Sequence, residues 1–350
     1  MFSIHSLASF FEEAAYRKHS DLSPNYPSDI FYQLSYLNLM EYEQDGVIYI
    51  ASYIDNTGSV YYPFVLRPIQ SSNSIISGIY YDIITPFEYG GPFLFPKDNH
   101  NVMRDFLKAL TNYCKAENIV SEFIRMHPFL CKKEWLEADY DILENCQNIY
   151  VDLLQTPAEI FSNFSAATRR NIRVASRQGI VIERTNLQDS DVFKELYLKT
   201  MDRLEANQNY YFSNRFFSSL KSAHKIQFKI YNACKKNGDV VASVLFVGNG
   251  KTIHYFLGGR ADLPRKEYVS NDFLFYEAIC DAIDAGFCFF HLGGAGKGQG
   301  GLLRFKSGFS TDRIPYYTAR KIHNPKVYQM LTNEVKPENA PQANFFPAYR

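Results

Sequence analysis

The feature that most constrains the fold is one order of expected strands and helices that occurs twice in the 350-residue chain. In the first half, a hairpin turn at 55–58 joins two strands, and a third strand, a helix and a strand follow. The ranges expected there are 47–54, 60–66, 77–84, 99–117 and 119–126. The second half repeats this order over 227–233, 240–247, 252–257, 270–285 and 287–292. The repetition predicts two copies of one α/β unit. Two unrelated α/β domains remain an alternative.

Chain length also favours about two domains, each large enough to bury a core. We expect an N-terminal domain over 1–150, a C-terminal domain over 151–325 and a tail over 326–350.

Composition excludes some classes of protein. Lys plus Arg and Asp plus Glu both number 37, so the formal net charge is zero and general binding to DNA is not expected. The six cysteines form no Cys-x-x-Cys pair, so we expect reduced thiols and no metal. The N-terminus lacks a signal peptide pattern, and no apolar run approaches the about 20 residues that span a bilayer. We expect a cytoplasmic protein.

The segment 287–309 carries the most chemical information. A short apolar strand runs into a glycine-rich loop, and Lys306 then lies between Phe305 and Phe309. Desolvation makes an ammonium costly among apolar groups unless an anion or a developing oxyanion needs it. Gly296, Gly298 and Gly301 formally match G-x-G-x-x-G, but no βαβ unit surrounds them, so we do not infer a dinucleotide site.

A basic stretch falls in a helix expected over about 157–179. Arg169, Arg173 and Arg177 recur every four residues, with Arg170 beside them, so they share one helix face. Guanidinium groups bind phosphates in a bidentate manner. A solvated surface is the alternative interpretation.

The run from Tyr150 to Phe309 resembles the Fem-type aminoacyltransferases and their acyltransferase relatives in the GNAT superfamily. Three groups of segments carry the resemblance: Thr168–Gly179; His254–Gly259 with Asn271–Ile279; and His291–Gly294 with Arg304–Phe309. The N-terminal half resembles the family more faintly, over Asp82–Pro92 and Ser121–Pro128. The resemblance implies tandem GNAT-like α/β domains, each with a mixed, largely antiparallel sheet flanked by helices.

The family's Phe-Lys pair corresponds to Phe305 and Lys306, which the resemblance places at the reacting carbonyl. In acyl transfer to an amine, each hydrogen-bond donor to the oxyanion lowers the barrier by about 3–4 kcal/mol. A general base contributes less, because an α-amino group with a pKa of about 7.7–8.0 is already partly neutral near pH 7. Tyr255, His254 and His291 are secondary candidates, and only one of His254 and Tyr255 faces a given pocket, because they alternate on one strand.

We expect substrate contacts from several further residues. The basic helix implies phosphate ligands, and Asn271 either binds substrate or caps the following helix together with Asp272. Tyr89 and Arg125 border the expected acceptor groove, whereas Arg67 is as readily explained by a buried ion pair. The glycine-loop amides either face a substrate oxygen or only allow close packing. The expected ligands are Arg169, Arg170, Arg173, Tyr89, Arg125, Asn271, Gly293 and Gly294.

The donor and the acceptor are less constrained. The segment 260–271 lacks the glycines with which GNAT enzymes hold coenzyme A, although Arg265 and Lys266 could replace them. We expect no tightly bound cofactor and a donor that is either acyl-CoA or aminoacyl-tRNA. The expected acceptor is an amine of a peptidoglycan precursor, another cell-envelope precursor or an amino sugar used in polysaccharides, and a lipid-linked acceptor would bring the protein to the membrane surface. The alternatives are an acyl-CoA-dependent acetyltransferase for a small metabolite and a non-catalytic protein that binds a nucleotide sugar or tRNA.

Overall fold

The computed structural model describes residues 1–16, 26–70, 78–223, 227–263, 269–296, 298–335 and 345–350. The chain forms two compact units. Unit 1 comprises residues 1–27, 31–145 and 316–350, and unit 2 comprises residues 28–30 and 146–315. This division differs from a single boundary near residue 150, because residues 318–322 near the C-terminus pair with a strand of the first unit.

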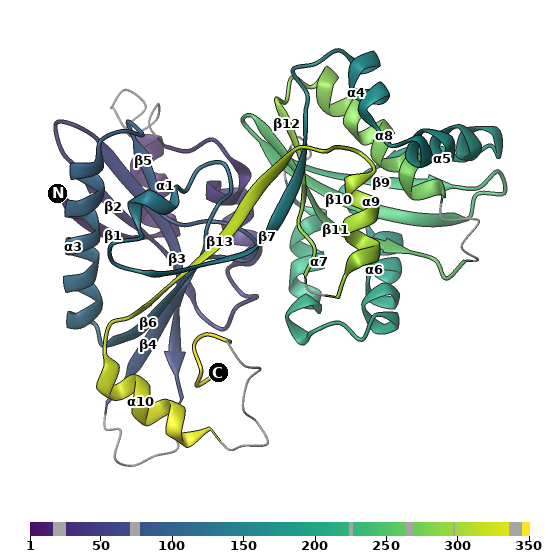
Figure 1. Cartoon of the computed structure of the whole chain (residues 1–350). Helices are drawn as coiled ribbons and strands as arrows, with labels where there is room; N and C mark the ends of the chain where they lie inside the picture. Colours follow the sequence, from purple (N-terminus) through teal and green to yellow (C-terminus); the bar gives the residue numbers. More distant parts are fainter. Residues whose placement is uncertain (17–25, 71–77, 224–226, 264–268, 297, 336–344) are drawn as a thin grey trace. The chain divides into compact units, whose positions relative to one another are not determined.

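Unit 1 is a mixed sheet in the order β1-β2-β3-β4-β6-β13, with β5 paired to β3 (Figure 1). The strands β2, β3 and β4 are antiparallel neighbours, and β4 pairs with β6 in parallel. The strands are β1 (Phe2–Ser6), β2 (Val47–Ile54), β3 (Ser59–Ile69), β4 (Tyr80–Ile84), β5 (Phe93–Phe95), β6 (Ile119–Arg125) and β13 (Arg313–Ile322). The helices are α1 (Leu7–Tyr16), α2 (Leu34–Met40), α3 (His100–Ala116) and α10 (Pro325–Glu334).

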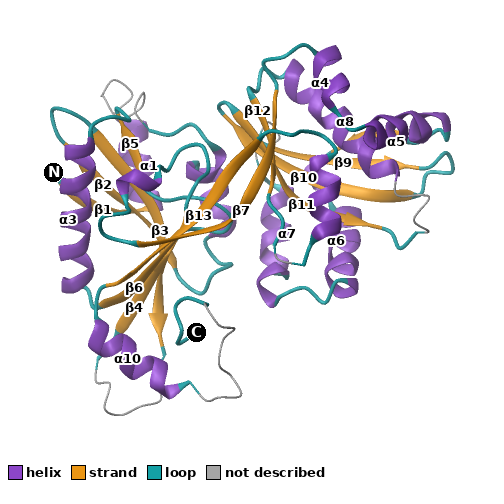
Figure 2. Ribbon diagram, viewed as in Figure 1, coloured by secondary structure: helices purple, strands orange, loops and turns teal. Residues whose placement is uncertain are grey.

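The strands of unit 2 are also mixed in direction, in the order β7-β12-β11-β10-β9-β8 (Figure 2). The strands β9, β10 and β11 are antiparallel neighbours, and β11 pairs with β12 in parallel. The strands are β7 (Asp141–Asp152), β8 (Val181–Thr185), β9 (Phe228–Cys234), β10 (Val240–Asn249), β11 (Thr252–Arg260) and β12 (Phe289–Gly293). The helices are α4 (Pro157–Asn163), α5 (Ala166–Arg177), α6 (Asp191–Arg203), α7 (Asn214–Lys221), α8 (Val269–Asp284) and α9 (Gly300–Ser307).

The expected repeat is present in both units. In each unit an antiparallel meander of three strands leads to a helix, α3 or α8, and then to a strand parallel to the third one. Each unit contains one strand that comes after the other copy of the repeat in the chain. The strand β7 follows β6 of the first copy but pairs with β12 of the second copy. The strand β13 follows β12 of the second copy but pairs with β6 of the first copy.

The single helix expected over 157–179 is wrong, because the chain forms α4 and α5 with a break between them. Phe164 has an extended backbone, with φ −62° and ψ 149°. Ser165 then caps α5 by accepting a hydrogen bond from the backbone N–H of Thr168. The N-cap hydrogen bond of Ser165 therefore starts a new helix, although the apolar periodicity of the sequence is continuous from α4 to α5.

Aromatic and aliphatic side chains from the sheet of unit 2 and from α8 form one core. Phe246, Phe275 and Phe290 are each at most 2% exposed, and their ring centroids lie 5.3–6.5 Å apart. The helix α8 covers this face of the sheet and contacts β8, β9 and β10. Unit 1 has its own core, between α3 and its sheet.

Candidate active site

Lys306 lies in the last turn of α9 and is only 5% exposed. Its Nζ donates a hydrogen bond to the carbonyl oxygen of Gly294 at 2.5 Å, and it lies 5.4 Å from the centroid of the Tyr255 ring. An ammonium that is buried between a carbonyl and the face of an aromatic ring is charge-stabilised on two sides. The structure therefore places this cation inside the protein, as its apolar neighbours indicate.

Phe305, next to Lys306, packs into the aromatic core. Its ring centroid lies 5.1 Å from that of Phe275 and 5.3 Å from that of Phe309, with edge-to-face geometry in both pairs. Phe309 in turn contacts Phe164, in the break between α4 and α5. These contacts hold α9 in place and pack the Phe305 ring against the core of unit 2.

The two parallel strands at the site part from each other. Pairing of β11 with β12 ends at His254 and His291, although β11 continues to Arg260. Tyr255 follows directly on β11, and its side chain points to the face that carries Lys306 and Phe275. His254 points to the opposite face, so the expected alternation holds and Tyr255 is the residue that accompanies the lysine.

The two glycines at the end of β12 shape its last residues. A bulge between His291 and Gly293 interrupts pairing with β7, and Gly293 has φ +70°, a conformation that favours glycine. At Gly294, a Cβ would lie 2.6 Å from Oδ1 of Asn148. The bare backbone at this position thus permits close packing on β7 and presents its carbonyl to Lys306.

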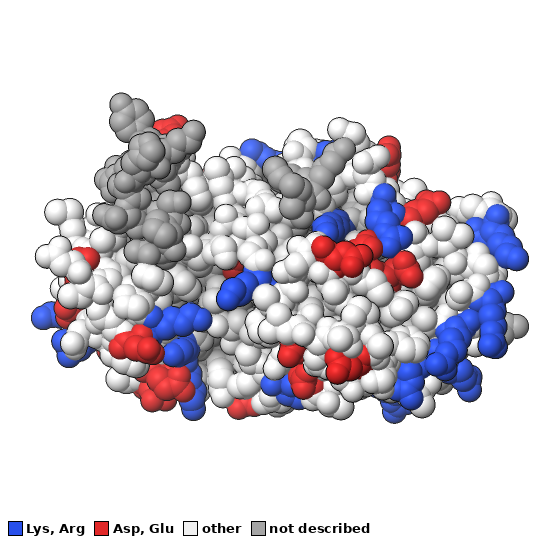
Figure 3. All heavy atoms as spheres, turned by 90° about the horizontal axis from the view of Figure 1, so that it is seen from above, with Lys and Arg blue, Asp and Glu red and all other residues white. Residues whose placement is uncertain are grey.

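The basic helix α5 is attached to the end of α9. The backbone N–H of Ser165 donates to the carbonyl of Gly308 at 2.8 Å. Arg170, Arg173 and Arg177 are exposed, and basic side chains gather at the right-hand end of the face in Figure 3, where α5 lies in Figure 1. Arg169 differs, because its guanidinium donates to the carbonyls of Ser162 and Phe164 and so closes the end of α4.

Asn271 and Asp272 lie inside the first turn of α8, since that helix begins at Val269; neither residue is its N-cap. Asp272 is 7% exposed, and Nδ2 of Asn171 donates to its Oδ2 at 3.4 Å. Burial raises the pKa of Asp272 to about 7. From the sequence alone this residue is only a candidate helix cap, because its burial follows from the packing of α8 on α5. Arg265 and Lys266 lie outside the described residues.

Three residues expected near the acceptor lie in unit 1. Tyr89 is 8% exposed and packs edge to face on Phe31 and Tyr316. Arg125 is half-buried, and its Nη1 donates to the carbonyl of Thr85 at 3.1 Å. Arg67 forms the buried ion pair considered above, with its Nε 2.7 Å from Oδ1 of Asp82. Both Tyr89 and Arg125 thus have packing or bonding roles within their own unit.

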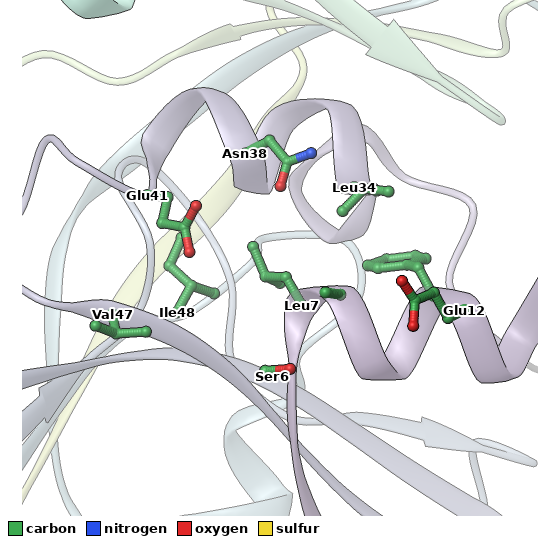
Figure 4. A pocket seen from close by; sticks show the side chains of 10 residues that line it. Ser6, Leu7, Glu12, Leu34, Asn38, Glu41, Val47 and Ile48 are labelled. Carbon is green, nitrogen blue, oxygen red and sulfur yellow. The ribbon is translucent and has the colours of Figure 1, made fainter.

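Unit 1 also has a pocket of about 490 Å³ between α1, α2 and β2 (Figure 4). Leu7, Leu34 and Ile48 give it apolar walls, while Glu12 and Glu41 bring carboxylates to it. The pocket contains none of the residues that sequence analysis selected. We therefore assign it no part in the chemistry.

The family model of the FemAB family matches residues 134–231. This range covers residues 134–145 of unit 1 and residues 146–231 of unit 2, which include α4 and α5. The resemblance to the FemAB family is confirmed. The match supports the expected enzyme class, acyl or aminoacyl transfer. No curated protein sequence matches the chain.

Solved structures support the fold at low sequence identity. FemX superimposes with a TM-score of 0.66 at 12% identity, over 94% of this chain and 99% of that one. The C-terminal domain of a putative lysylphosphatidylglycerol synthetase from Agrobacterium fabrum gives 0.54 at 15% identity, over 92% and 94%. A conserved protein of unknown function from Bacteroides thetaiotaomicron gives 0.53 at 13% identity, over 91% and 99%. The expected tandem GNAT-like fold is confirmed.

Two residues that contact the candidate site region were not found from the sequence. Asp29 accepts from His254, 225 positions away, and Asn148 bonds to His291, 143 positions away. Neither lies in a motif, so only the fold reveals them. Among the described residues, no helix combines the length and apolar character needed to cross a membrane.

Proposed function

We propose that this protein is an N-acyltransferase that moves an acyl or aminoacyl group to an amine, with Lys306 stabilising the oxyanion. The observation that carries the proposal is the buried ammonium where β11 and β12 part, held by Gly294 and the Tyr255 ring. A positive charge fixed in a water-poor site gains most when negative charge develops beside it. Phe305 excludes water from the same place.

In the proposed reaction, the neutral amine attacks the donor carbonyl, and the carbonyl oxygen becomes negative. Lys306 donates a hydrogen bond to that oxygen, and collapse of the tetrahedral intermediate expels the donor's thiolate or the alkoxide of the tRNA. The amine loses one proton, which the leaving group takes up. Asp272, whose pKa burial raises to about 7, precedes Phe275 by three residues on α8, and Phe275 contacts Phe305; we assign to its carboxyl the binding or deprotonation of the incoming amine.

The first turn of α8 favours aminoacyl-tRNA over coenzyme A as the donor. In a GNAT fold this helix end would receive a pyrophosphate, but here it contains the buried carboxyl of Asp272. The pKa of that carboxyl is about 7, and its ionised form, present at neutral and higher pH, would repel a second anion. Arg170 and Arg173 on α5 offer exposed guanidinium groups for a phosphate backbone instead. We propose a cell-envelope precursor or an amino sugar as the acceptor, following the FemAB match.

The test is intact mass spectrometry of amine acceptors incubated with the protein and either charged tRNA or acyl-CoA. The acceptor panel contains peptidoglycan precursors with a free amine and amino sugars. A mass increase by one acyl or aminoacyl residue, lost in Lys306→Met, supports the proposal. Binding of tRNA or a nucleotide sugar without transfer from any donor would instead indicate a non-catalytic relative.

A further inference from the structure

A chain of four buried polar side chains crosses unit 2 on the sheet face opposite Lys306. Nε2 of His254 lies 3.1 Å from Oδ2 of Asp29, Nδ1 of His254 lies 3.0 Å from Nδ1 of His291, and Nε2 of His291 lies 3.1 Å from Nδ2 of Asn148. Their exposed fractions are 5% for Asp29, 1% for each histidine and 0% for Asn148. Burial of polar side chains costs free energy of folding unless they are hydrogen-bonded, and apolar side chains could fill the same space. A buried chain of four polar side chains therefore points to a role other than stability.

The bonding pattern gives the chain one direction. The amide nitrogen of Asn148 only donates, so Nε2 of His291 accepts and the proton of that ring is on Nδ1. Nδ1 of His291 then donates to Nδ1 of His254, which places the His254 proton on Nε2, facing the carboxylate of Asp29. Both imidazoles are neutral in this arrangement. The oxygen Oδ1 of Asn148 accepts from Sγ of Cys146 at 3.6 Å, consistent with the same orientation.

This chain of hydrogen bonds ends at Asn148, next to Gly294, whose backbone carbonyl binds Lys306. His254 and His291 are direct partners in the β11–β12 register, and Asn148 reaches His291 from the neighbouring strand β7. The Oδ1 of Asn148 packs on Gly294, where a side chain would overlap it. The carbonyl of the same Gly294 accepts from Lys306. One residue thus separates the end of the chain from the ammonium.

We propose that Asp29, His254, His291 and Asn148 are positioning residues, a hydrogen-bond chain that fixes the Gly294 carbonyl and through it the Lys306 ammonium. The inference rests on the proposed function for its catalytic meaning. The hydrogen bond to His291 holds the Asn148 side chain in one orientation, and its Oδ1 then packs against Gly294 and fixes the position of this residue after the bulge at Gly293. Apolar side chains would fill the same space without specifying that orientation.

The first test observes the imidazole protons directly. Long-range ¹H–¹⁵N spectra of protein with ¹⁵N-labelled histidine should show His291 protonated on Nδ1 and His254 on Nε2. Replacement of Asn148 by Asp removes the donor to His291, so the His291 signals should change in Asn148→Asp. The opposite tautomers in the unaltered protein would overturn the inference.

The second test measures the lysine without any substrate. Trace labelling with acetic anhydride, followed by peptide mass spectrometry, reports how accessible and how neutral the Lys306 amine is. Loss of a charge-assisted hydrogen bond predicts labelling about tenfold faster in Asn148→Asp. The matched control is His323→Gln, since His323 is equally buried and bonds to Glu122 in unit 1 at 3.0 Å. It should lower stability and leave Lys306 labelling unchanged.

A pair of glycine variants covers the case in which Asn148→Asp does not fold. In Gly294→Ala the new methyl group overlaps both Sγ of Cys146 and Oδ1 of Asn148, whereas at Gly296 a Cβ meets only the flexible Gln299 side chain at 3.7 Å. Faster Lys306 labelling in Gly294→Ala and not in Gly296→Ala supports the inference. Equal labelling in every folded variant would overturn it.

The outcomes for the two proposals are separable. A labelling change without acyl transfer to any acceptor leaves the positioning chain intact and rejects the enzymatic function. Once an acceptor is known, Asn148→Asp should lower kcat about tenfold with little change in KM, because the ammonium is misplaced mainly in the transition state. A raised KM with unchanged kcat would contradict the positioning role.

Discussion

The Nζ of Lys306 donates to the carbonyl oxygen of Gly294 at 2.5 Å, and this bond joins α9 to the end of β12. The donor lies on a helix and the acceptor lies just after a strand bulge, 12 residues earlier in the chain. The bond therefore fixes Gly294 against α9. A cation that is held in one place is suited to bind a reacting carbonyl.

Replacement of Lys306 by Met should remove most of the activity while the protein remains folded. Loss of one oxyanion donor lowers kcat by about 10²–10³-fold. The melting temperature should change little, because removal of a buried charge offsets the lost bond to Gly294. Lys321→Met is the matched control, since Lys321 also lies over an aromatic ring, that of Tyr140 at 4.8 Å, but in unit 1. Activity retained in Lys306→Met would exclude the central assignment.

The ring of Tyr255 should matter more than its hydroxyl group. Tyr255→Phe keeps the aromatic face 5.4 Å from Nζ of Lys306, whereas Tyr255→Leu removes it. A cation–π contact is worth about 0.5–2 kcal/mol, which predicts a several-fold to about 30-fold lower kcat in the leucine variant. Steady-state kinetics of both variants, at matched folded fractions, measure this difference. Equal losses in the two variants would point to the hydroxyl instead.

Local sequence signals were sufficient for the repeated units and for the lysine. Alternating apolar residues and turns such as 55–58 predicted β2 and β3, and the Phe305–Phe309 spacing indicated a buried Lys306. The helix break at Ser165 could not be predicted from the apolar periodicity, which continues through it. The break depends on a local hydrogen bond, from the backbone N–H of Thr168 to the Ser165 side chain.

Partners that depend on chain topology could not be predicted. Asp29 and Asn148 have no motif, and they meet the two histidines only because β7 and the segment 28–30 join unit 2. Arg169 was expected to bind phosphate, but the break between α4 and α5 exposes carbonyls that its guanidinium satisfies. In each case the deciding contact comes from packing that sequence spacing does not encode.

The exposed arginines of α5 should contribute affinity for a phosphate-rich donor. Arg170→Gln combined with Arg173→Gln should raise KM for charged tRNA and leave kcat nearly unchanged, because these side chains lie on the helix surface. Each lost phosphate contact should lower the slope of log affinity against log salt by about 0.7–0.9. Titrations at several salt concentrations measure the slope. Lys194→Gln with Lys199→Gln on α6 removes the same charge elsewhere and should leave the slope unchanged.

Asp272 should make stability depend on pH. Burial raises the pKa of its carboxyl from 3.8 to about 7, so between these values the folded protein binds a proton that the unfolded chain has lost. Its contribution to stability is therefore present at pH 4, falls as the pH rises and levels off above pH 7. A shift of this size corresponds to about 4 kcal/mol across the window.

The variant Asp272→Asn tests this dependence, because an amide stays neutral at every pH and can still accept from Asn171. We expect it to unfold at a higher urea concentration than the unaltered protein, with a much larger gain at pH 8 than at pH 5, because the loss of stability that starts near pH 3.8 continues up to about pH 7, where the folded protein gives up its proton, and is far from complete at pH 5. Asp262→Asn, in an exposed loop of the same unit, is the control and should shift neither midpoint. If Asp272→Asn gave the same gain at both pH values, the carboxyl would already be ionised at pH 5, and the role proposed for it with the incoming amine would lose its basis.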